Sequence, residues 1–235
     1  MSAKTCACAL ALMFAFALQS RAALIISEVV FNEVGSDVTG EWVEIFNEGP
    51  AVVALDNYKI GDEETQLGTG TTEAIHRFPV GATIAPGELQ IVAVSATRFN
   101  TVYGLLPTYE VNPTNGTVPD MLGYLPWDAD GGAMNMSNTN DQIVLINPTD
   151  MIIDAASWGS STFAFNPALG AALDGQSYQR KNVYIDTNTA DDWETVPGDT
   201  AAERSTPFSA PIPEPATLTS LFAVALGFLA YRRRR

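Results

Sequence analysis

The chain is poor in cysteine, histidine and basic residues, and each scarcity disfavours a class of function. It has 235 residues, with 2 cysteines, 1 histidine, and 12 Lys+Arg against 27 Asp+Glu. Catalysis of the Ser-His-Asp type would have to run through His76, which sits beside Arg77 in a short apolar stretch. Because no G-x-S-x-G motif accompanies it, we interpret His76 as a surface or interstrand histidine rather than a general base.

The N-terminus has the three parts of a secretory signal peptide. Lys4 supplies the positive charge, an apolar run follows from Cys6 to Leu18, and Ser20-Arg21-Ala22 places small residues at a cleavage site. We expect residues 1–22 to be removed by signal peptidase, with Ala22 as the favoured cut and Ala23 as the next. The mature protein then lacks Cys6 and Cys8, which excludes a disulfide, a thiol nucleophile and a thiolate zinc site.

The C-terminus, residues 211–235, combines a short motif, an apolar run and a basic end. The motif is Pro213-Glu214-Pro215, and the run from Ala216 to Tyr231 would span about 24 Å as a helix, enough for a membrane segment with snorkelling arginines. The basic end consists of Arg232, Arg233, Arg234 and Arg235, which predicts a cytoplasmic terminus with the body on the far side of the membrane. A plain tail anchor is the alternative reading.

The order of these three parts resembles the PEP-CTERM sorting signal of bacterial surface proteins. That resemblance implies transient anchoring in the membrane, followed by cleavage by an exosortase-type transpeptidase. We therefore expect export across the inner membrane and a final location at the cell surface or in the extracellular matrix.

Removal of both end segments leaves a strongly acidic body. Lys4, Arg21, the four terminal arginines and Glu214 belong to those segments, so the body carries a net charge of about −20. Such a surface repels nucleic acid and anionic lipid and attracts cations. High negative charge also favours solubility, which is the simpler explanation.

Residues 23–210 read as one all-β domain. Apolar or alternating stretches bounded by turn signals predict short strands, and no window shows a convincing helical repeat. This pattern favours a β-sandwich or barrel, with Trp42 and Phe46 in the core. The predicted strands are 24–31, 41–46, 52–60, 74–78, 88–94, 142–146 and 151–158.

The body also resembles the lamin-tail domain. The resemblance begins with Leu24-Ile25-Ile26-Ser27-Glu28-Val29 and Glu41-Trp42-Val43-Glu44-Ile45-Phe46-Asn47, and continues through 53–60, 84–92, 137–145, 175–180 and 191–193. It implies an immunoglobulin-like β-sandwich and an interaction module. The Pro- and Gly-rich connection between Ala96 and Met136 departs from the family pattern.

Two kinds of binding residue stand out in the body. Asp128 and Asp130 precede two glycines, as oxygen-ligand loops for calcium require, although no glutamate closes an EF-hand pattern. Trp127 lies in the irregular connection, where an exposed aromatic side chain could stack on a sugar or a partner surface. The simpler interpretation, which we favour, is that it covers the end of the sandwich. A second acidic cluster contains Asp186, Asn188, Asp191 and Asp192.

The sequence leaves three functional classes open. We favour a noncatalytic surface or matrix protein that binds exopolysaccharide or surface proteins, since the PEP-CTERM resemblance implies that setting and the lamin-tail resemblance implies an interaction module. An extracellular hydrolase needs a pair of carboxylates that nothing in the sequence singles out. A calcium-dependent adhesin would use the Asp128 and Asp130 loop.

Replacement of Pro213-Glu214-Pro215 by three alanines tests the sorting assignment. We expect the variant precursor to stay uncleaved in the inner membrane, because the transpeptidase would lose its recognition motif. Immunoblots of fractionated cells would show this directly. Normal processing of the variant would contradict the assignment.

Overall fold

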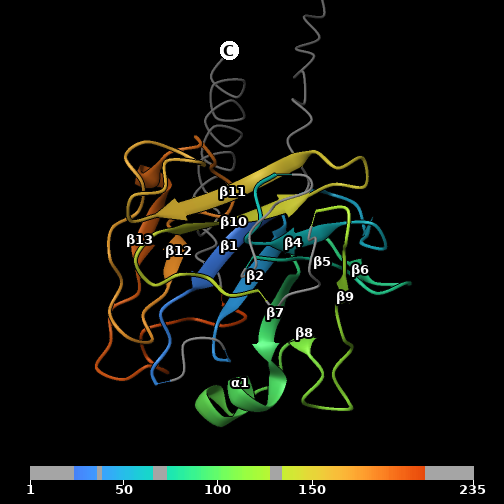
Figure 1. Ribbon diagram of the computed structural model, residues 1–235, viewed down its shortest axis with the longest axis horizontal. Helices are drawn as coiled ribbons and strands as arrows, with labels where there is room; N and C mark the ends of the chain where they lie inside the picture. Colours follow the sequence, from blue (N-terminus) through green and yellow to red (C-terminus); the bar gives the residue numbers. More distant parts are fainter. Residues whose placement is uncertain (1–23, 36–38, 66–72, 128–133, 210–235) are drawn as a thin grey trace, which may run out of the picture.

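The computed structural model describes residues 24–35, 39–65, 73–127 and 134–209. Two β-sheets face each other across one core, with a third small sheet and a short helix outside them (Figure 1). Both predicted targeting segments lie outside the described residues. Among the residues that are described, no helix is long and apolar enough to cross a membrane.

The larger sheet has six strands, and all pairs are antiparallel except the last. Its order is β13 (Trp193–Thr195), β12 (Tyr178–Arg180), β1 (Leu24–Val30), β2 (Trp42–Asn47), β7 (Leu89–Ser95) and β8 (Tyr109–Asn112).

The facing sheet has five strands, all antiparallel. Its order is β11 (Ile152–Trp158), β10 (Asp141–Ile146), β4 (Lys59–Gly61), β5 (Ile75–Arg77) and β9 (Leu122–Gly123). A separate two-stranded sheet pairs β3 (Val53–Ala54) with β6 (Thr83–Ile84).

The predicted all-β architecture is confirmed, and six predicted strands correspond to β1, β2, β5, β7, β10 and β11. The seventh, 52–60, was wrong as a single strand. It divides into β3 and β4 around a turn in which the Tyr58 amide donates to the Leu55 carbonyl. The short strands β6, β8, β9, β12 and β13, each two to four residues long, were not predicted.

The core lies between the two large sheets and follows the period-2 alternation of the strands, except for one step of three residues at the bulge in β1. From β1 and the residue after it, Leu24, Ile26, Val29 and Phe31 point inward, and all are buried. The Phe31 ring stacks on Trp158 of β11, with the ring centroids 4.1 Å apart and the planes 5° from parallel. This stack packs the end of β1 against the end of β11 and so joins the two sheets.

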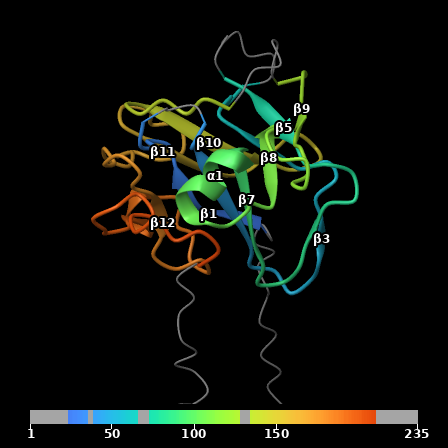
Figure 2. The same cartoon turned by 90° about the horizontal axis from the view of Figure 1, so that it is seen from below.

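Trp42 and Phe46 are both fully buried, as predicted, but on the outer face of the six-stranded sheet. Trp42 is covered by α1 (Ala96–Tyr103), whose Phe99 and Tyr103 rings meet it edge-on. Figure 2 shows α1 lying over this sheet, beside β7. The outer face of this sheet is therefore buried too, where α1 covers it.

The helix α1 corrects the expectation that the body contains no helix. It connects β7 to β8, and because these strands are parallel the chain must cross over between them. The Ser95 hydroxyl caps the first turn by accepting from the Arg98 amide, and Gly104 ends the helix at φ 69°. With only eight residues, the helix was too short to give a periodic signal.

A buried ion pair joins the two large sheets. Arg180 of β12 donates two hydrogen bonds of 2.9 Å to Asp154 of β11, and both side chains are 1 % exposed. The same two side chains bind the backbone of Ile26, whose amide donates to Asp154 and whose carbonyl accepts from Arg180. Ile26 lies at a bulge in β1, so these contacts satisfy backbone groups that the strand ladder leaves unpaired.

We expect Asp154→Ala to lower the free energy of unfolding by about 3–5 kcal/mol, because Arg180 would lose its fully buried partner and the Ile26 amide would lose its acceptor. Arg180 would keep only the contacts with Asp186 at 3.1 Å and Asp192 at 3.9 Å. Urea unfolding followed by tryptophan fluorescence would measure the change. The control is Asp120→Ala at an exposed site, where the expected change is within about 0.5 kcal/mol. Equal effects of the two variants would show that the ion pair does not stabilise the fold.

Candidate functional site

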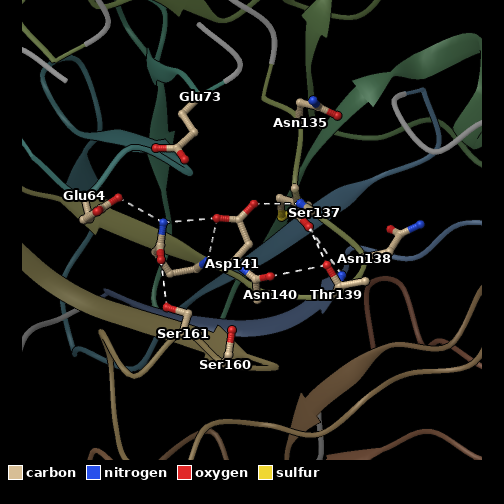
Figure 3. Close-up of a pocket in the computed structure, with 12 residues that line it drawn as sticks. Glu64, Glu73, Asn135, Ser137, Asn138, Thr139, Asn140, Asp141, Ser160 and Ser161 are labelled. Atoms are coloured by element: carbon tan, nitrogen blue, oxygen red, sulfur yellow. Dashed lines mark hydrogen bonds between the residues drawn. The ribbon is translucent and has the colours of Figure 1, made fainter. Parts of the chain in front are cut away.

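A polar cleft of about 770 Å³ opens at one end of the five-stranded sheet, where β10 begins and β4 and β11 end. Figure 3 shows Glu64 and Glu73 on one side of it and the segment from Ser137 to Thr139 on the other. None of its lining residues is basic or aromatic. They are Glu64, Glu73, Asn135, Met136, Ser137, Asn138, Thr139, Asn140, Asp141, Gln142, Ser160 and Ser161.

Strand pairing brings the two walls of the cleft together. β10 is antiparallel to β4, with Val144 opposite Gly61, so the start of β10 lies beside the residues that follow β4. The side-chain amide of Gln142 donates from Nε2 to Glu64 at 3.0 Å and to Asp141 at 3.1 Å, and its Oε1 atom accepts from the Ser161 hydroxyl at 2.9 Å. Gln142 thereby holds side chains from three segments in fixed positions.

A close backbone approach shapes the floor of the cleft. Gly159 follows β11 with a φ of 65°, and a Cβ atom there would lie 1.8 Å from the Thr139 carbonyl oxygen. Any side chain would therefore push away the loop that carries Ser137 and Thr139. The requirement for glycine positions this loop against Ser160 and Ser161.

Two carboxylates are buried behind the cleft wall. Asp62 accepts hydrogen bonds from the amides of Ala74 and Asn135, at 2.7 Å and 2.9 Å. Glu41 accepts from the Met136 amide at 2.9 Å with one oxygen, while its Oε1 atom has no hydrogen-bond partner. Both residues are 0 % exposed.

The pKa values of these carboxyl groups are raised above their ordinary values. Burial, with repulsion from Asp62 and Asp141, raises the pKa of Glu41 to about 9. Burial raises the pKa of Asp62 to about 7, against two backbone hydrogen bonds that lower it. The pKa of Glu73 is also raised to about 7, by desolvation and then by the charges of Glu64, Asp141 and Glu63. The acidic groups in and behind the cleft therefore repel one another, and no basic residue lines the cleft to neutralise them.

The mouth of the cleft offers oxygen atoms at spacing suited to a cation. One carboxylate oxygen each from Glu63, Glu64 and Glu73 lies within 4.8 Å of the others. Hard cations such as Ca²⁺ take carboxylate and amide oxygens as ligands. The same groups, with the serine and asparagine side chains, can hydrogen-bond a polyhydroxylated ligand.

Trp127 does not belong to this cleft, and the less favoured interpretation, an exposed aromatic side chain that binds a ligand, is wrong. The residue is only 4 % exposed and packs against Ile75, Val144 and Ile146 on the outer face of the five-stranded sheet. It covers part of the sandwich, as the simpler interpretation predicts, but over the outer face of a sheet. Its indole ring is unavailable for stacking on a sugar.

His76 is an interstrand residue, as we interpreted it. It lies in β5 opposite Ile60 of β4 and Gly123 of β9, and is 5 % exposed. It does not line the polar cleft. A role as a general base for a ligand in the cleft therefore has no support.

The predicted calcium residues Asp128 and Asp130 lie outside the described residues, as do Ala22, Ala23 and the whole of 210–235. The second acidic cluster is described and has a structural role. Asp186 accepts from Arg180 at 3.1 Å. Asp192 accepts from the amide and hydroxyl of Thr187, which fixes the turn before β13.

The cleft residues themselves were missed by sequence reasoning. A signal was present, since the run Asp62-Glu63-Glu64 follows one predicted strand and Ser137 to Asp141 precede another. Their proximity depends on the pairing of β4 with β10, which joins residues about 80 positions apart. No local pattern specifies that pairing.

The fold and cleft define a β-sandwich module whose candidate site is built on loops at one end of a sheet. The family model of the Lamin Tail Domain matches residues 18–160, which is more than half of the chain. The chain belongs to the lamin-tail domain family. This fold is typically noncatalytic, and no enzyme family is indicated.

A solved structure supports the same fold. The crystal structure of a DUF4876 family protein from Bacteroides thetaiotaomicron, at 2.50 Å resolution, is similar with a TM-score of 0.55 and 15 % sequence identity. The similarity covers 80 % of this chain and 75 % of that chain. No curated protein matches the chain significantly.

Glu41→Gln should change how stability depends on pH. In the wild type the folded state keeps a proton on Glu41 that the unfolded chain releases above its ordinary pKa, so stability falls as pH rises through about 9. The glutamine keeps an acceptor for the Met136 amide but cannot ionise. Relative to wild type, the variant should gain at least about 1.4 kcal/mol between about pH 5 and pH 9.

Urea unfolding across this pH range would measure the gain. Asp199→Asn, at an exposed position, is the matched control and should show no such relative gain. A Glu41→Gln variant whose stability parallels that of wild type at every pH would mean that Glu41 is ionised in the folded protein.

Proposed function

We infer that this chain is an exported, noncatalytic binding module that acts at the cell surface or in the exopolysaccharide layer. The observation that carries the binding role is the cleft of about 770 Å³, lined by carboxylate, amide and hydroxyl groups at one end of a rigid sandwich. Binding residues commonly lie on loops that a rigid scaffold positions. The lamin-tail fold supports an interaction module but does not identify its partner.

The sequence at both ends supports export and sorting. The signal peptide, with cleavage at Ala22, would deliver the body across the inner membrane. The Pro213-Glu214-Pro215 motif and its apolar run would then anchor it until an exosortase-type transpeptidase cleaves the tail. These end segments would interact with the membrane and the processing enzymes, and the body would interact with matrix partners.

The chemistry of the cleft favours a neutral or positively charged polyhydroxylated ligand. Glu64, Glu73 and Asp141 place negative charge at its walls, and none of its lining residues is basic. Ser160, Ser161 and the asparagines add donors and acceptors for sugar hydroxyls. An anionic polymer would meet repulsion both here and over the acidic body.

Two alternatives share the carboxylates of this cleft. The grouping of Glu63, Glu64 and Glu73 supports a calcium-dependent adhesin, with a site different from Asp128 and Asp130. The raised pKa of Glu73, which comes from desolvation and from Glu64, supports an extracellular hydrolase, because glycoside hydrolysis pairs a protonated with an ionised carboxyl group. Both alternatives predict that a change at Glu73 affects function.

The first test is the intact mass and location of the native protein in fractionated cells. Loss of both end segments, with the body in the surface or matrix fraction, is the expected result. A protein in the membrane fraction that retains Arg232 to Arg235 would contradict exosortase sorting and indicate a permanent anchor.

The second test is binding of the purified protein to the producing cells' own exopolysaccharide, with calcium and with chelator. We expect binding that Gln142→Ala weakens at least about tenfold, because that residue organises both cleft walls. Asp120→Asn is the matched control at an exposed site. Binding lost with chelator would favour the adhesin, cleavage of the polymer would favour the hydrolase, and full binding by Gln142→Ala would exclude the cleft.

A further inference from the structure

Residues 205–209, at the end of the described part of the chain, are held on the outer face of the six-stranded sheet by two buried glutamates. Glu28 of β1 accepts from the Thr206 amide and lies 2.8 Å from the Thr206 hydroxyl. Glu44 of β2 accepts from the Phe208 amide at 2.6 Å and from the Ser27 hydroxyl at 2.7 Å. Glu28 and Glu44 are direct partners in the β1–β2 register, so the two carboxyl groups project side by side from the sheet.

This arrangement places two acids together without a counter-charge. Glu28 is 1 % exposed and Glu44 is 0 % exposed. Among the described residues, neither forms an ion pair with a lysine or arginine. Two neighbouring carboxylates in such a position cannot both ionise without a large loss of stability.

The hydrogen bonds at Thr206 can accommodate a proton on Glu28. The Thr206 hydroxyl lies 2.8 Å from a Glu28 oxygen and 2.8 Å from the Gln179 side-chain oxygen. One hydroxyl has a single proton to donate. When Glu28 is protonated it can donate to Thr206, which then donates to Gln179, and both contacts are satisfied. When Glu28 is ionised, Thr206 donates to Glu28, and both contacts are satisfied only if the Gln179 amide group turns its NH2 toward Thr206.

We propose that Glu28 and Glu44 form a proton-dependent latch, which holds residues 205–209 against the six-stranded sheet and releases them when the two carboxyl groups ionise. Release would also break the contact of the Ser205 hydroxyl with Tyr103 at the end of α1. The freed segment directly precedes residue 210, so opening would lengthen the chain between the folded body and its C-terminal tail. The latch rests on contacts within the body and is independent of the ligand of the cleft.

The direction of the pH response follows from burial. Desolvation raises the pKa of Glu28, and desolvation followed by repulsion from Glu28 raises the pKa of Glu44 to about 8. The closed form therefore binds protons that the open form releases, so closure is favoured at low pH and weakens as pH rises toward and through about 8.

Other charged groups near the latch do not reverse this direction. Tyr103 of α1 feels the charges of Glu28 and Glu33, and burial raises its pKa, so it stays neutral over the same range. Arg98 of the same helix is paired with Glu33. On the segment leading to the latch, Arg204 donates to the carbonyls of Gly198, Asp174 and Asp199. Arg180 of β12 is paired with Asp154 across the core.

Hydrogen exchange of the full-length protein in mild detergent tests the latch. The readout is the protection factor of the Thr206 and Phe208 amides, corrected at each pH for the intrinsic exchange rate. We expect it to fall at least about tenfold from about pH 6 to about pH 9. The Val43 amide in β2 should stay more protected than both at each pH, which distinguishes local opening from global unfolding.

The double variant Glu28→Gln/Glu44→Gln should reduce the fall to less than about threefold, since glutamine cannot ionise. Glu194→Gln, at an exposed position of the same sheet, should behave like wild type. Wild-type protection that is independent of pH would overturn the proposal, as would an equal fall in the double variant. If the double variant does not fold, the wild-type comparison decides: loss of Val43 protection together with the latch amides would overturn the proposal.

Discussion

The fold depends on the contact of Arg180 with Asp154, because that contact joins the two sheets where β1 is irregular. The bulge leaves the Ile26 amide and carbonyl to be bound by these two side chains. The guanidinium also lies over the Trp193 ring, 4.8 Å from its centroid, and so connects β13 to the same point. The family match ends at residue 160, yet the arginine that closes the core comes from residue 180. The structural unit therefore continues through β12 and β13.

A shortage of basic residues explains how the other buried acids are accommodated. With 12 Lys+Arg against 27 Asp+Glu, few carboxylates can have an ionic partner. Asp154 is paired with Arg180, whereas Glu41 and Glu44 rely on backbone amides and on raised pKa values. Burying an acid in its neutral form avoids the desolvation of a charge, but it makes the surrounding contacts sensitive to pH. The region behind the cleft wall and the contacts of residues 205–209 both have this property.

The sequence could predict those parts of the fold that depend on local pattern. Apolar or alternating stretches between turn signals predicted β1, β2, β5, β7, β10 and β11, because a buried strand leaves its pattern in the residues themselves. The helix α1 was missed since its signals were two caps, Ser95 and Gly104, around a short segment. Trp127 was placed in a loop correctly but its burial depends on Val144 and Ile146, which are close only in space. The cleft was missed for the same reason, as Glu64 meets Gln142 through sheet order alone.

The body and its end segments contribute different parts of the proposed function. In the proposed function the end segments direct export and sorting, and this proposal comes from their sequence alone. What the body binds depends on how Gln142 holds Glu64, Asp141 and Ser161 together, which only the paired strands determine. A lamin-tail fold with other loops at this end of the sheet would keep the sandwich and lose the cleft, so membership of the family cannot by itself specify the ligand. Specificity in this chain should therefore follow the loops at 62–64 and 135–142 rather than the core.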